Sequence, residues 1–300
     1  MKFDIDELSI KNKHKVDNAI IMAAGISSRF SPISYEYPKA LLKVKGEILI
    51  ERQIKQLKEA GINDITVVVG YKKELFYYLK DNYNVSIVEN PEYMERNNNS
   101  TLYYVRDQLS NTYICSADNY FMENVFESYV RNAYYSAVFQ GGDTNEWCMR
   151  TDSDGLIIDV AIGGSNSWVM LGHAFFTKEF SEKFVDILEK IYNYPDTKPL
   201  LWESIYKNYI DQLPMYIRKY SEKIIFEFDT LDELRTFDES YCDNTGSKVL
   251  KQVSKELNCK ERDIVEAKPL NIEGEIIGFT FKIDNVKYKY IYKEKLLHEV

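Results

Sequence analysis

Runs of apolar residues alternate along the chain with segments in which apolar residues recur every three or four positions. The first kind predicts buried strands, and the second predicts helices that pack one face against a sheet. In the first third of the chain the strand-like segments are 18–22, 64–69 and 85–89, and the helix-like segments are 48–60 and 72–83. This alternation predicts an α/β domain around an open, doubly wound, mostly parallel, Rossmann-like sheet.

The same pattern continues to about residue 240 and then changes. Further strands are expected at 38–44, 111–118, 134–140, 147–150, 155–162, 167–176, 215–220 and 223–228, and further helices at 102–109, 178–192, 198–213 and 231–237. The segment CDNTG, at 242–246, interrupts the pattern and reads as a linker. We therefore predict a tail at 1–17, a main domain at 18–240 and a small α+β appendage at 247–300, with strands at 278–283 and 287–292.

The composition favours a globular protein that acts on small molecules. The chain has 300 residues, a hydrophobic fraction of 45% and a formal net charge of −9. A chain this acidic is not expected to be a general binder of nucleic acid or of anionic membranes. No apolar run reaches transmembrane length, and the opening residues lack the apolar core of a secretory signal. We expect a cytoplasmic protein with no membrane insertion.

The stretch from Asn18 to Lys39 carries the first candidate chemistry. It passes from a buried strand into small residues, which allow backbone N–H groups to approach an anion closely. The small residues are Ala23, Ala24, Gly25, Ser27 and Ser28. Arg29 and Lys39 would place positive charge on the same phosphates. The alternative is an ordinary turn at the end of a strand, in which Gly25 serves the turn alone.

Two aspartates at the ends of predicted strands are candidates for a metal site. Asp118 ends the strand at 111–118, and Asp229 follows the strand at 223–228. If both strands belong to one sheet, the two carboxylates would converge on one Mg²⁺. This ion typically takes one or two carboxylates and completes its coordination with phosphate oxygens and water. The alternative is that each aspartate caps a turn.

A polar cluster at 97–101 precedes the predicted helix at 102–109. Its functional interpretation is recognition of a nucleotide base or ribose, with Asn98 and Ser100 as the candidates, because an amide offers both donors and acceptors. The alternative is a loop that caps the helix, since asparagine and serine are common capping residues.

Two of the three tryptophans stand beside acids, at Glu146-Trp147 and at Trp202-Glu203. A quaternary ammonium group cannot donate hydrogen bonds, so aromatic faces and nearby carboxylates are what recognise it. Trp147 and Trp202 are therefore candidates for the pocket of a cationic substrate group. The alternative is that both are ordinary core residues.

Together these motifs resemble those of the bacterial CTP:phosphocholine cytidylyltransferases, over about residues 18–240. The motifs are the loop at 23–30, Pro38-Lys39, Asp118-Asn119-Tyr120, Thr144-Asn145-Glu146-Trp147, Leu201-Trp202-Glu203 and Phe226-Glu227-Phe228-Asp229. The chain departs from the pattern at Ser27, where the wider superfamily of nucleotidyltransferases often has a glycine. A serine is compatible with a tight loop there.

The resemblance implies transfer of CMP from CTP to phosphocholine, with Mg²⁺ held by Asp118 and Asp229. It implies that Trp147 and Trp202 line the choline pocket, with Glu203 or Tyr120 as helpers. Residues 247–300 resemble the opening of a choline kinase, cut short before its catalytic motifs. An accessory unit for packing or self-association is the interpretation that we favour for this segment, so a homo-oligomer is possible.

Two other functions are compatible with the same residues. One is the same chemistry on another acceptor, namely phosphoethanolamine, an aminophosphonate, or a sugar 1-phosphate with UTP or dTTP. The other is a nucleotide-binding regulatory protein without transferase activity, which would bind CTP and release no pyrophosphate.

Overall fold

The structure is a computed structural model that describes residues 12–300, so most of the predicted N-terminal tail lies outside the described residues. The chain divides into two units, each formed by two stretches of sequence. Unit 1 contains the residues up to Gly25 together with 50–227, and unit 2 contains 26–49 together with 228–300. This division differs from the predicted boundaries, since 26–49 and 228–240 group with the C-terminal segment.

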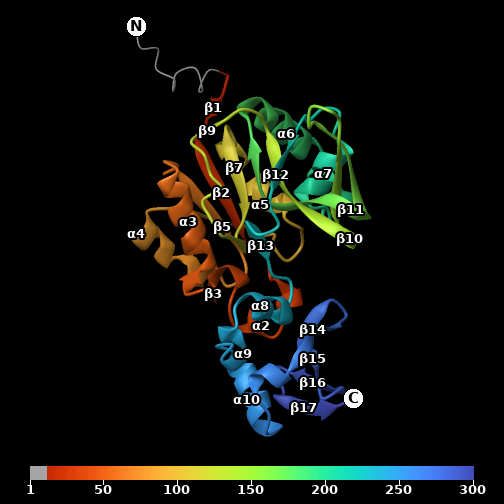
Figure 1. Cartoon of the computed structure of the whole chain (residues 1–300). Helices are drawn as coiled ribbons and strands as arrows, with labels where there is room; N and C mark the ends of the chain where they lie inside the picture. Colours follow the sequence, from red (N-terminus) through yellow and green to blue (C-terminus); the bar gives the residue numbers. More distant parts are fainter. Residues whose placement is uncertain (1–11) are drawn as a thin grey trace. The chain divides into compact units, whose positions relative to one another are not determined.

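Unit 1 is built on a seven-stranded sheet in the order β12-β10-β11-β7-β2-β5-β6 (Figure 1). Its strands are β2 (Asn18–Ala23), β5 (Ile65–Val69), β6 (Ser86–Glu89), β7 (Thr112–Ser116), β10 (Tyr134–Thr151), β11 (Ile157–Phe176) and β12 (Tyr216–Tyr220). Pairing is parallel except where β11 meets β10 and β7. The prediction of a mostly parallel, Rossmann-like sheet is confirmed.

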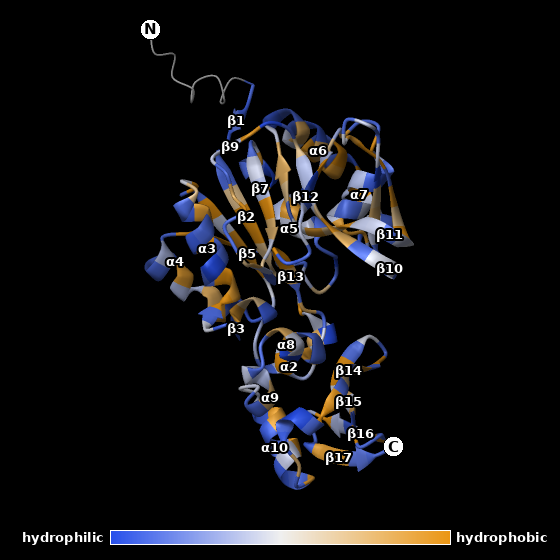
Figure 2. Ribbon diagram, viewed as in Figure 1, coloured by the Kyte–Doolittle hydropathy of each residue, from blue (hydrophilic) through white to orange (hydrophobic). Residues whose placement is uncertain are grey.

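Helices and short 3-10 turns connect these strands. They are α3 (Leu49–Glu59), η3 (Lys73–Phe76), α4 (Tyr78–Tyr83), α5 (Asn99–Tyr104), η4 (Arg106–Gln108), α6 (Lys178–Ile191), η5 (Pro195–Thr197) and α7 (Trp202–Asn208). Strand β5 is buried along its whole length, as expected for an apolar strand covered on both faces. Figure 2 shows the apolar colouring concentrated on the central strands β2 and β5. A two-residue pair, β1 (His14–Lys15) with β9 (Tyr129–Val130), lies outside this sheet.

The four short strands predicted between 134 and 176 are in fact two long ones, and residues 141–146, which separate the first two predicted strands, belong to β10. β10 and β11 stay paired through several irregularities of register, one of them between Gln140 and Asp143. A β-bulge bends a strand without ending the ladder. Gly142 and Gly163 have φ angles of 74° and 81°. Glycine reaches this left-handed region at little cost, so the polar segment remains part of a bent strand.

Other predicted elements are shorter than expected. The strand at 38–44 is wrong in its first half, which forms the 3-10 turn η2 (Lys39–Leu41) before β3 (Lys43–Val44) pairs with β4 (Glu47–Ile48). The Leu41 N–H bonds to the carbonyl of Pro38, which closes that turn. The helices predicted at 72–83 and 102–109 each divide into a 3-10 turn and an α-helix, and the helix predicted at 198–213 is limited to α7.

The strands beside the two candidate metal ligands belong to different sheets. Asp118 follows β7 of the seven-stranded sheet and directly precedes β8 (Asn119–Phe121). β8 pairs with β13 (Ile225–Glu227) as a separate antiparallel pair, in which Asn119 stands opposite Glu227. Asp229 is the second residue after β13. The condition that both strands share one sheet is therefore not met.

Unit 2 combines the loop after β2 with the C-terminal part of the chain. Its further elements are η1 (Ser28–Phe30), α2 (Ile33–Glu36), α8 (Leu231–Phe237), α9 (Ser240–Asp243), α10 (Lys248–Glu256), η6 (Glu261–Asp263), and the antiparallel sheet of β14 (Val265–Ile272), β15 (Glu275–Ile283), β16 (Val286–Ile291) and β17 (Leu296–Glu299). Thr230 and Glu233 form a capping box at the start of α8. The expected small α+β appendage is present in this unit.

Long-range contacts hold the two stretches of unit 2 together. The Lys45 N–H donates to the Asp238 carboxylate over 2.6 Å, and the Tyr241 hydroxyl donates to the carbonyl of Lys43 over 3.2 Å. Tyr35 stacks on Tyr292 with ring centroids 3.8 Å apart. In the described part of the chain, no helix is both long and apolar enough to span a membrane.

His173, on β11, is a buried histidine in the core of unit 1. Its Nε2 lies 2.8 Å from the Tyr134 hydroxyl, and its ring packs against the rings of Tyr113 and Phe126. Burial, with a smaller effect of the Arg218 charge, lowers the pKa of His173 to about 3. In an unfolded chain the pKa of histidine is about 6.5. As the pH falls below that value the unfolded chain gains a proton that the folded chain does not, so stability is lost.

We expect the free energy of unfolding to fall by about 1.4 kcal/mol through His173 when the pH is lowered from 7.5 to 5.5. The measurement is urea unfolding of the wild-type chain and of His173→Phe at both pH values. Between these pH values the free energy of unfolding of the variant should fall by about 1.4 kcal/mol less than that of the wild-type chain. An equal loss of stability in both proteins would contradict the assignment.

Candidate active site

The predicted site residues are divided between the two units. Unit 1 carries Ala23, Ala24, Gly25, Asn98, Ser100, Asp118, Tyr120, Trp147, Trp202 and Glu203, and unit 2 carries Ser27, Ser28, Arg29, Lys39 and Asp229.

In unit 1 the candidate phosphate loop begins where β2 ends. The carbonyl of Ala24 accepts a hydrogen bond from the N–H of Tyr71 over 3.0 Å. A Cβ added to Gly70 would come within 2.9 Å of that carbonyl oxygen, so the close approach of the two strand ends requires a glycine at 70. A Cβ at Gly25 would meet no atom within 4 Å. The protein leaves open space beside Gly25, which suits the approach of an anion.

In unit 2 the same loop turns at Ser27. This residue has φ 53° and ψ 47°, in the left-handed region, and its carbonyl accepts a hydrogen bond from the Phe30 N–H over 2.9 Å. A non-glycine residue in this region carries strain of about 1–3 kcal/mol. The backbone conformation thus gives a physical reason why a glycine would be preferred at position 27.

Arg29, Lys39 and Asp229 form one ionic cluster within unit 2. Asp229 Oδ2 lies 2.5 Å from Arg29 Nη1, and Asp229 Oδ1 lies 3.9 Å from Lys39 Nζ. The Lys39 side chain is 4% exposed, whereas that of Arg29 is 70% exposed. Lys39 Nζ also lies 5.9 Å from the centroid of the Phe30 ring. A lysine held this deeply is costly to desolvate, so its carboxylate partner stabilises it there.

The two candidate metal ligands, Asp118 and Asp229, lie in different units. Among residues 12–300, no group of three or more His, Cys, Asp or Glu side chains is placed to hold a metal ion. The candidates Asp118 and Asp229 supply two carboxylates. Carboxylate oxygens are ligands that a hard divalent cation accepts, and the role of these two aspartates in holding one stays a prediction.

The asparagines at 97–99 tie their loop to the start of α7 and to the segment before it. Asn98 Oδ1 accepts from the Trp202 N–H over 2.7 Å, and Asn98 Nδ2 donates to Glu203 Oε2 over 3.2 Å. Asn99 Nδ2 donates to the carbonyl of Thr197 over 3.0 Å. The Ser100 hydroxyl is fully buried and receives a hydrogen bond from Asn90. These side chains bond within the protein, and their contact with a nucleotide stays a prediction.

Trp202 lies in the hydrophobic core, as the alternative interpretation expected. It is 1% exposed and stacks on Tyr135, with ring centroids 5.6 Å apart and 19° between the planes. Phe176 packs edge-on against it at 5.2 Å. Trp147 is half-buried on β10 and packs against the same cluster. Of the two tryptophans, Trp147 is the one whose side chain a ligand can reach more easily.

Glu203 is a half-buried carboxylate beside this aromatic cluster. The Tyr135 hydroxyl donates to Glu203 Oε1 over 3.2 Å, opposite the hydrogen bond from Asn98. Burial raises the pKa of Glu203 to about 7, although both hydrogen bonds act in the other direction. Among residues 12–300, no lysine or arginine forms an ion pair with Glu203. A cation from a ligand would therefore be favoured beside it.

Two residues of these surroundings, Tyr135 and Glu227, were not predicted from the sequence as site residues. Burial raises the pKa of the Tyr135 hydroxyl well above its usual value, and the carboxylates of Glu203, Glu227 and Asp118 add to the effect. Glu227 therefore belongs to the same acidic surroundings, and it receives a hydrogen bond from Asn119 Nδ2 over 3.4 Å. The only sequence signal for Glu227 is its place in the motif that ends at Asp229. Tyr135 has no such signal, because a tyrosine is common in buried strands.

Tyr120 is buried on β8, and the Arg52 guanidinium lies 4.7 Å from its ring centroid. Arg52 Nε also donates to the carbonyl of Phe121 over 3.0 Å. The cation over Tyr120 is thus supplied by the protein itself. The part of Tyr120 in substrate binding stays a prediction.

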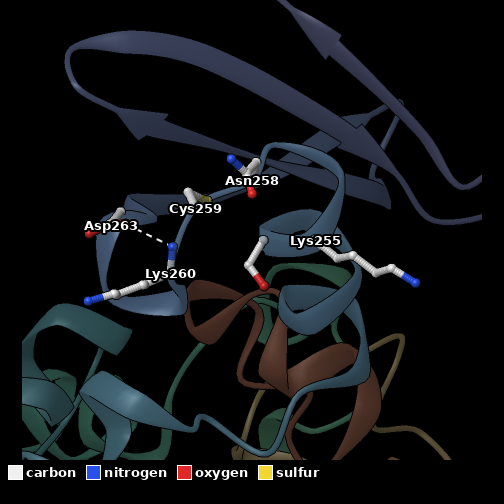
Figure 3. Close-up of a pocket in the computed structure, with 6 residues that line it drawn as sticks. Lys255, Asn258, Cys259, Lys260 and Asp263 are labelled. Carbon is white, nitrogen blue, oxygen red and sulfur yellow. Dashed lines mark hydrogen bonds between the residues drawn. The ribbon is translucent and has the colours of Figure 1, made fainter.

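A hollow of about 470 Å³ lies at the C-terminal end of α10 in unit 2 (Figure 3). It is lined by Ser254, Lys255, Asn258, Cys259, Lys260 and Asp263, none of which is a predicted site residue. Figure 3 shows the Lys260 N–H bonded to Asp263, over 2.8 Å. Burial raises the pKa of the Cys259 thiol, which makes this cysteine less reactive.

Comparison with known proteins gives the family. The model of the MobA-like NTP transferase domain matches residues 19–156. The choline-phosphate cytidylyltransferase of Streptococcus pneumoniae is 36% identical over 221 residues, which cover 74% of this chain and 96% of that protein. The chain belongs to the bacterial cytidylyltransferase family. The 2-aminoethylphosphonate cytidylyltransferase of Lancefieldella rimae is also 36% identical, over 75% of this chain and 93% of its own length.

Solved structures agree with this membership. The CTP:phosphocholine cytidylyltransferase of S. pneumoniae matches with a TM-score of 0.73 at 36% identity, over 76% of this chain and 99% of that one. The inositol-1-phosphate CTP transferase of T. maritima matches with a TM-score of 0.60 at 16% identity, which shows the fold alone. The chain is thus a nucleotidyltransferase, and its cytidylyltransferase relatives fit transfer of CMP. Nucleotidyltransferases of this family generally use a divalent metal ion.

Proposed function

We propose that this cytidylyltransferase transfers CMP from CTP to choline phosphate, giving CDP-choline and pyrophosphate. The observation that carries the proposal is Glu203, a half-buried carboxylate that forms no ion pair with a lysine or arginine among the described residues. It follows Trp202, which belongs to the core cluster against which the half-buried Trp147 packs. Negative charge with aromatic surface is the chemistry that recognises a trimethylammonium group. Glu227 and Asp118 add negative charge around Tyr135.

The nucleotide would be held by the loop after β2. Backbone N–H groups around Ala23, Ala24, Gly25, Ser27 and Ser28 would approach the CTP phosphates, as small residues allow. Ser100 is left out of this assignment because its hydroxyl is buried and bonded within the protein.

Arg29 and Lys39 would neutralise phosphate charge as the two anionic substrates come together, and Asp118 and Asp229 would hold Mg²⁺. The ion supplies further charge neutralisation when bound. The Arg29–Asp229 ion pair supports these roles, because it keeps a cation and a carboxylate ready within one cluster of unit 2.

The reaction needs no covalent intermediate with the protein. A phosphate oxygen of choline phosphate forms a bond to the α-phosphorus of CTP, and the bond between that phosphorus and the oxygen bridging to the β-phosphate breaks. Pyrophosphate carries away the electron pair. Because the nucleophile is already an anion, catalysis is mainly positioning and charge neutralisation.

A second acceptor is favoured by a specific observation. Trp202 is almost completely buried, which leaves carboxylates as a large part of the recognition surface. A primary ammonium prefers hydrogen-bonding carboxylates to aromatic faces. The L. rimae relative, named as a 2-aminoethylphosphonate cytidylyltransferase, is as similar as the choline-phosphate enzyme of S. pneumoniae. Phosphoethanolamine and aminophosphonates are therefore the second candidates.

The test is a pyrophosphate-release assay that crosses CTP, UTP, ATP and dTTP with choline phosphate, phosphoethanolamine, 2-aminoethylphosphonate and glucose 1-phosphate. We expect the highest kcat/KM for CTP with choline phosphate. A preference for glucose 1-phosphate with UTP or dTTP would overturn the proposal. CTP binding without pyrophosphate from any acceptor would identify an inactive regulatory protein instead.

Trp147→Ala distinguishes the two classes of ammonium group. If Trp147 contacts a trimethylammonium, its removal should raise the KM for choline phosphate by about tenfold, in line with a cation–π contact of 1–2 kcal/mol. The KM for 2-aminoethylphosphonate should change less. Trp168→Ala is a suitable control, because Trp168 is also half-buried in the β10–β11 region of unit 1. Equal losses on both acceptors would argue against an aromatic contact with choline.

The proposal also covers the C-terminal unit, the oligomeric state, the compartment and the partners of the enzyme. The C-terminal part of unit 2, a helix followed by an antiparallel sheet, is proposed to be an accessory unit that resembles the opening of a choline kinase. Its use in self-association would make the enzyme a homo-oligomer. We further propose a cytoplasmic enzyme. Its substrates are small molecules, and nucleic acid is not among its partners.

A further inference from the structure

We propose that Asn98 and Tyr135 are positioning residues, which hold the Glu203 carboxylate in place for the ammonium group of the acceptor. This inference rests on the proposed function and assigns to Asn98 a role other than contact with the nucleotide. It is argued within unit 1, where all three residues lie.

Asn98 and Tyr135 hold one carboxylate oxygen of Glu203 each. Asn98 donates to Glu203 Oε2 and Tyr135 donates to Oε1, both over 3.2 Å. A carboxylate has about four lone-pair directions, so two hydrogen bonds orient it and leave acceptor capacity for a ligand. Glu203 is half-buried, which leaves part of its surface reachable.

Both donors are themselves fixed by the core. Asn98 Oδ1 accepts from the Trp202 N–H over 2.7 Å, which determines the direction of its amide donor. The Tyr135 ring stacks on Trp202, which is 1% exposed. Trp202 thus acts on the site indirectly, because its backbone holds one donor and its ring holds the other.

The charge of Glu203 depends on its surroundings. Burial raises the pKa of Glu203 to about 7, so only part of the population is ionised at neutral pH. The carboxylates of Glu227 and Asp118, both negative, also act electrostatically on Tyr135. A cationic acceptor stabilises the ionised form. Hydrogen bonds from Asn98 and Tyr135 favour the same form, and their loss should raise the pKa and weaken acceptor binding near pH 7.

The experiment compares Tyr135→Phe with the wild-type chain by pyrophosphate release, over pH 6 to 9, with saturating CTP and varied choline phosphate. Removing the hydroxyl keeps the ring stack on Trp202. We expect about a tenfold higher KM for the acceptor at pH 7, because the ionised carboxylate loses one of its two hydrogen bonds. The KM for CTP should be unchanged. The midpoint of the pH profile of kcat/KM for the acceptor should move to higher pH. The difference in kcat/KM between the variant and the wild-type chain should therefore be smaller at pH 9 than at pH 7.

Three further variants make the result specific. Asn98→Ala should shift the midpoint in the same direction. Glu203→Gln should remove that titration, and what remains in its profile belongs to the acceptor phosphate, whose second pKa is about 6. Tyr78→Phe is the matched control, because the Tyr78 hydroxyl donates to Glu51 over 2.8 Å in the same unit. It should behave as the wild-type chain does.

The outcomes separate the inference from the proposed function. If the wild-type chain releases pyrophosphate with an ammonium-bearing acceptor and Tyr135→Phe keeps the wild-type midpoint and acceptor KM, the inference is overturned while the proposed function stands. A Glu203→Gln profile identical to the wild-type profile also overturns it. If the wild-type chain uses no ammonium-bearing acceptor, the proposed function fails and the inference fails with it.

Discussion

Replacing Asp118 or Asp229 with asparagine should lower kcat by orders of magnitude at saturating Mg²⁺. Asparagine keeps the size of the side chain and removes the negative charge that a hard cation prefers. The charge stabilisation that a metal ion provides is worth several kcal/mol, so the expected loss is on the order of 10³-fold. The measurement is pyrophosphate release from CTP and choline phosphate, across a titration of Mg²⁺.

The control for Asp118→Asn is Asp107→Asn, which neutralises an exposed aspartate of the same unit. Calorimetry of CTP binding with and without Mg²⁺ gives a readout besides activity. We expect the metal to strengthen CTP binding in the wild-type chain and to do so much less in either variant. Near wild-type turnover in Asp118→Asn or in Asp229→Asn would exclude that residue from the metal site.

Lys39→Ala should lower kcat by about 10² to 10³, by analogy with the removal of one donor to a developing negative charge. Lys39 is suited to this role because its side chain is 4% exposed and Asp229 holds it at 3.9 Å. A buried cation interacts more strongly with phosphate than an exposed one, since the local dielectric is lower. The effect should appear in kcat at saturating CTP and acceptor.

Lys39→Met separates charge from packing, because methionine fills much of the same volume without the ammonium. If charge is the cause, Lys39→Met should lose as much activity as Lys39→Ala. Lys43→Ala is the matched control on the exposed surface of unit 2. An unaltered kcat in Lys39→Ala would refute the catalytic role of this lysine.

Much of the fold could be predicted because its signals are local. Strand β5 consists of β-branched residues and is fully buried, and α3 follows the spacing of an amphipathic helix. Each signal depends on a few neighbouring residues, so alternation of strand and helix already specifies a sheet of this class. The chain's membership of the cytidylyltransferases was predicted for the same reason, since its motifs are short and contiguous.

The long strands β10 and β11 could not be predicted in this way. The polar segment at 141–146 stays in the ladder because bulges and glycines with positive φ bend the strand. Such pairing joins residues that are distant in sequence, and local composition does not report it. For the same reason the sequence suggested one sheet for the strands next to Asp118 and Asp229, whereas β13 pairs with β8.

The contacts within the candidate site could not be predicted from local sequence either. The sequence marked Trp202 and Glu203 as neighbours, but it left open whether the tryptophan faces a ligand or the core. The structure places Trp202 in the core and brings Tyr135, 67 positions earlier in the chain, onto its ring. Asn98 was marked as a polar loop residue, and only the fold shows that it bonds to the backbone of Trp202 and to Glu203.

By itself, then, the sequence determined the class of the sheet, the family and the residue types available for phosphate and metal chemistry, because these depend on local periodicity and contiguous motifs. Tertiary structure decided which polar groups share a partner. It joined Arg29 and Lys39 to Asp229, and it placed Glu203 between two fixed donors, with no ion pair to a lysine or arginine in the described part of the chain. Charge and burial at a site are sums over residues that only folding brings together, so they are decided at that level.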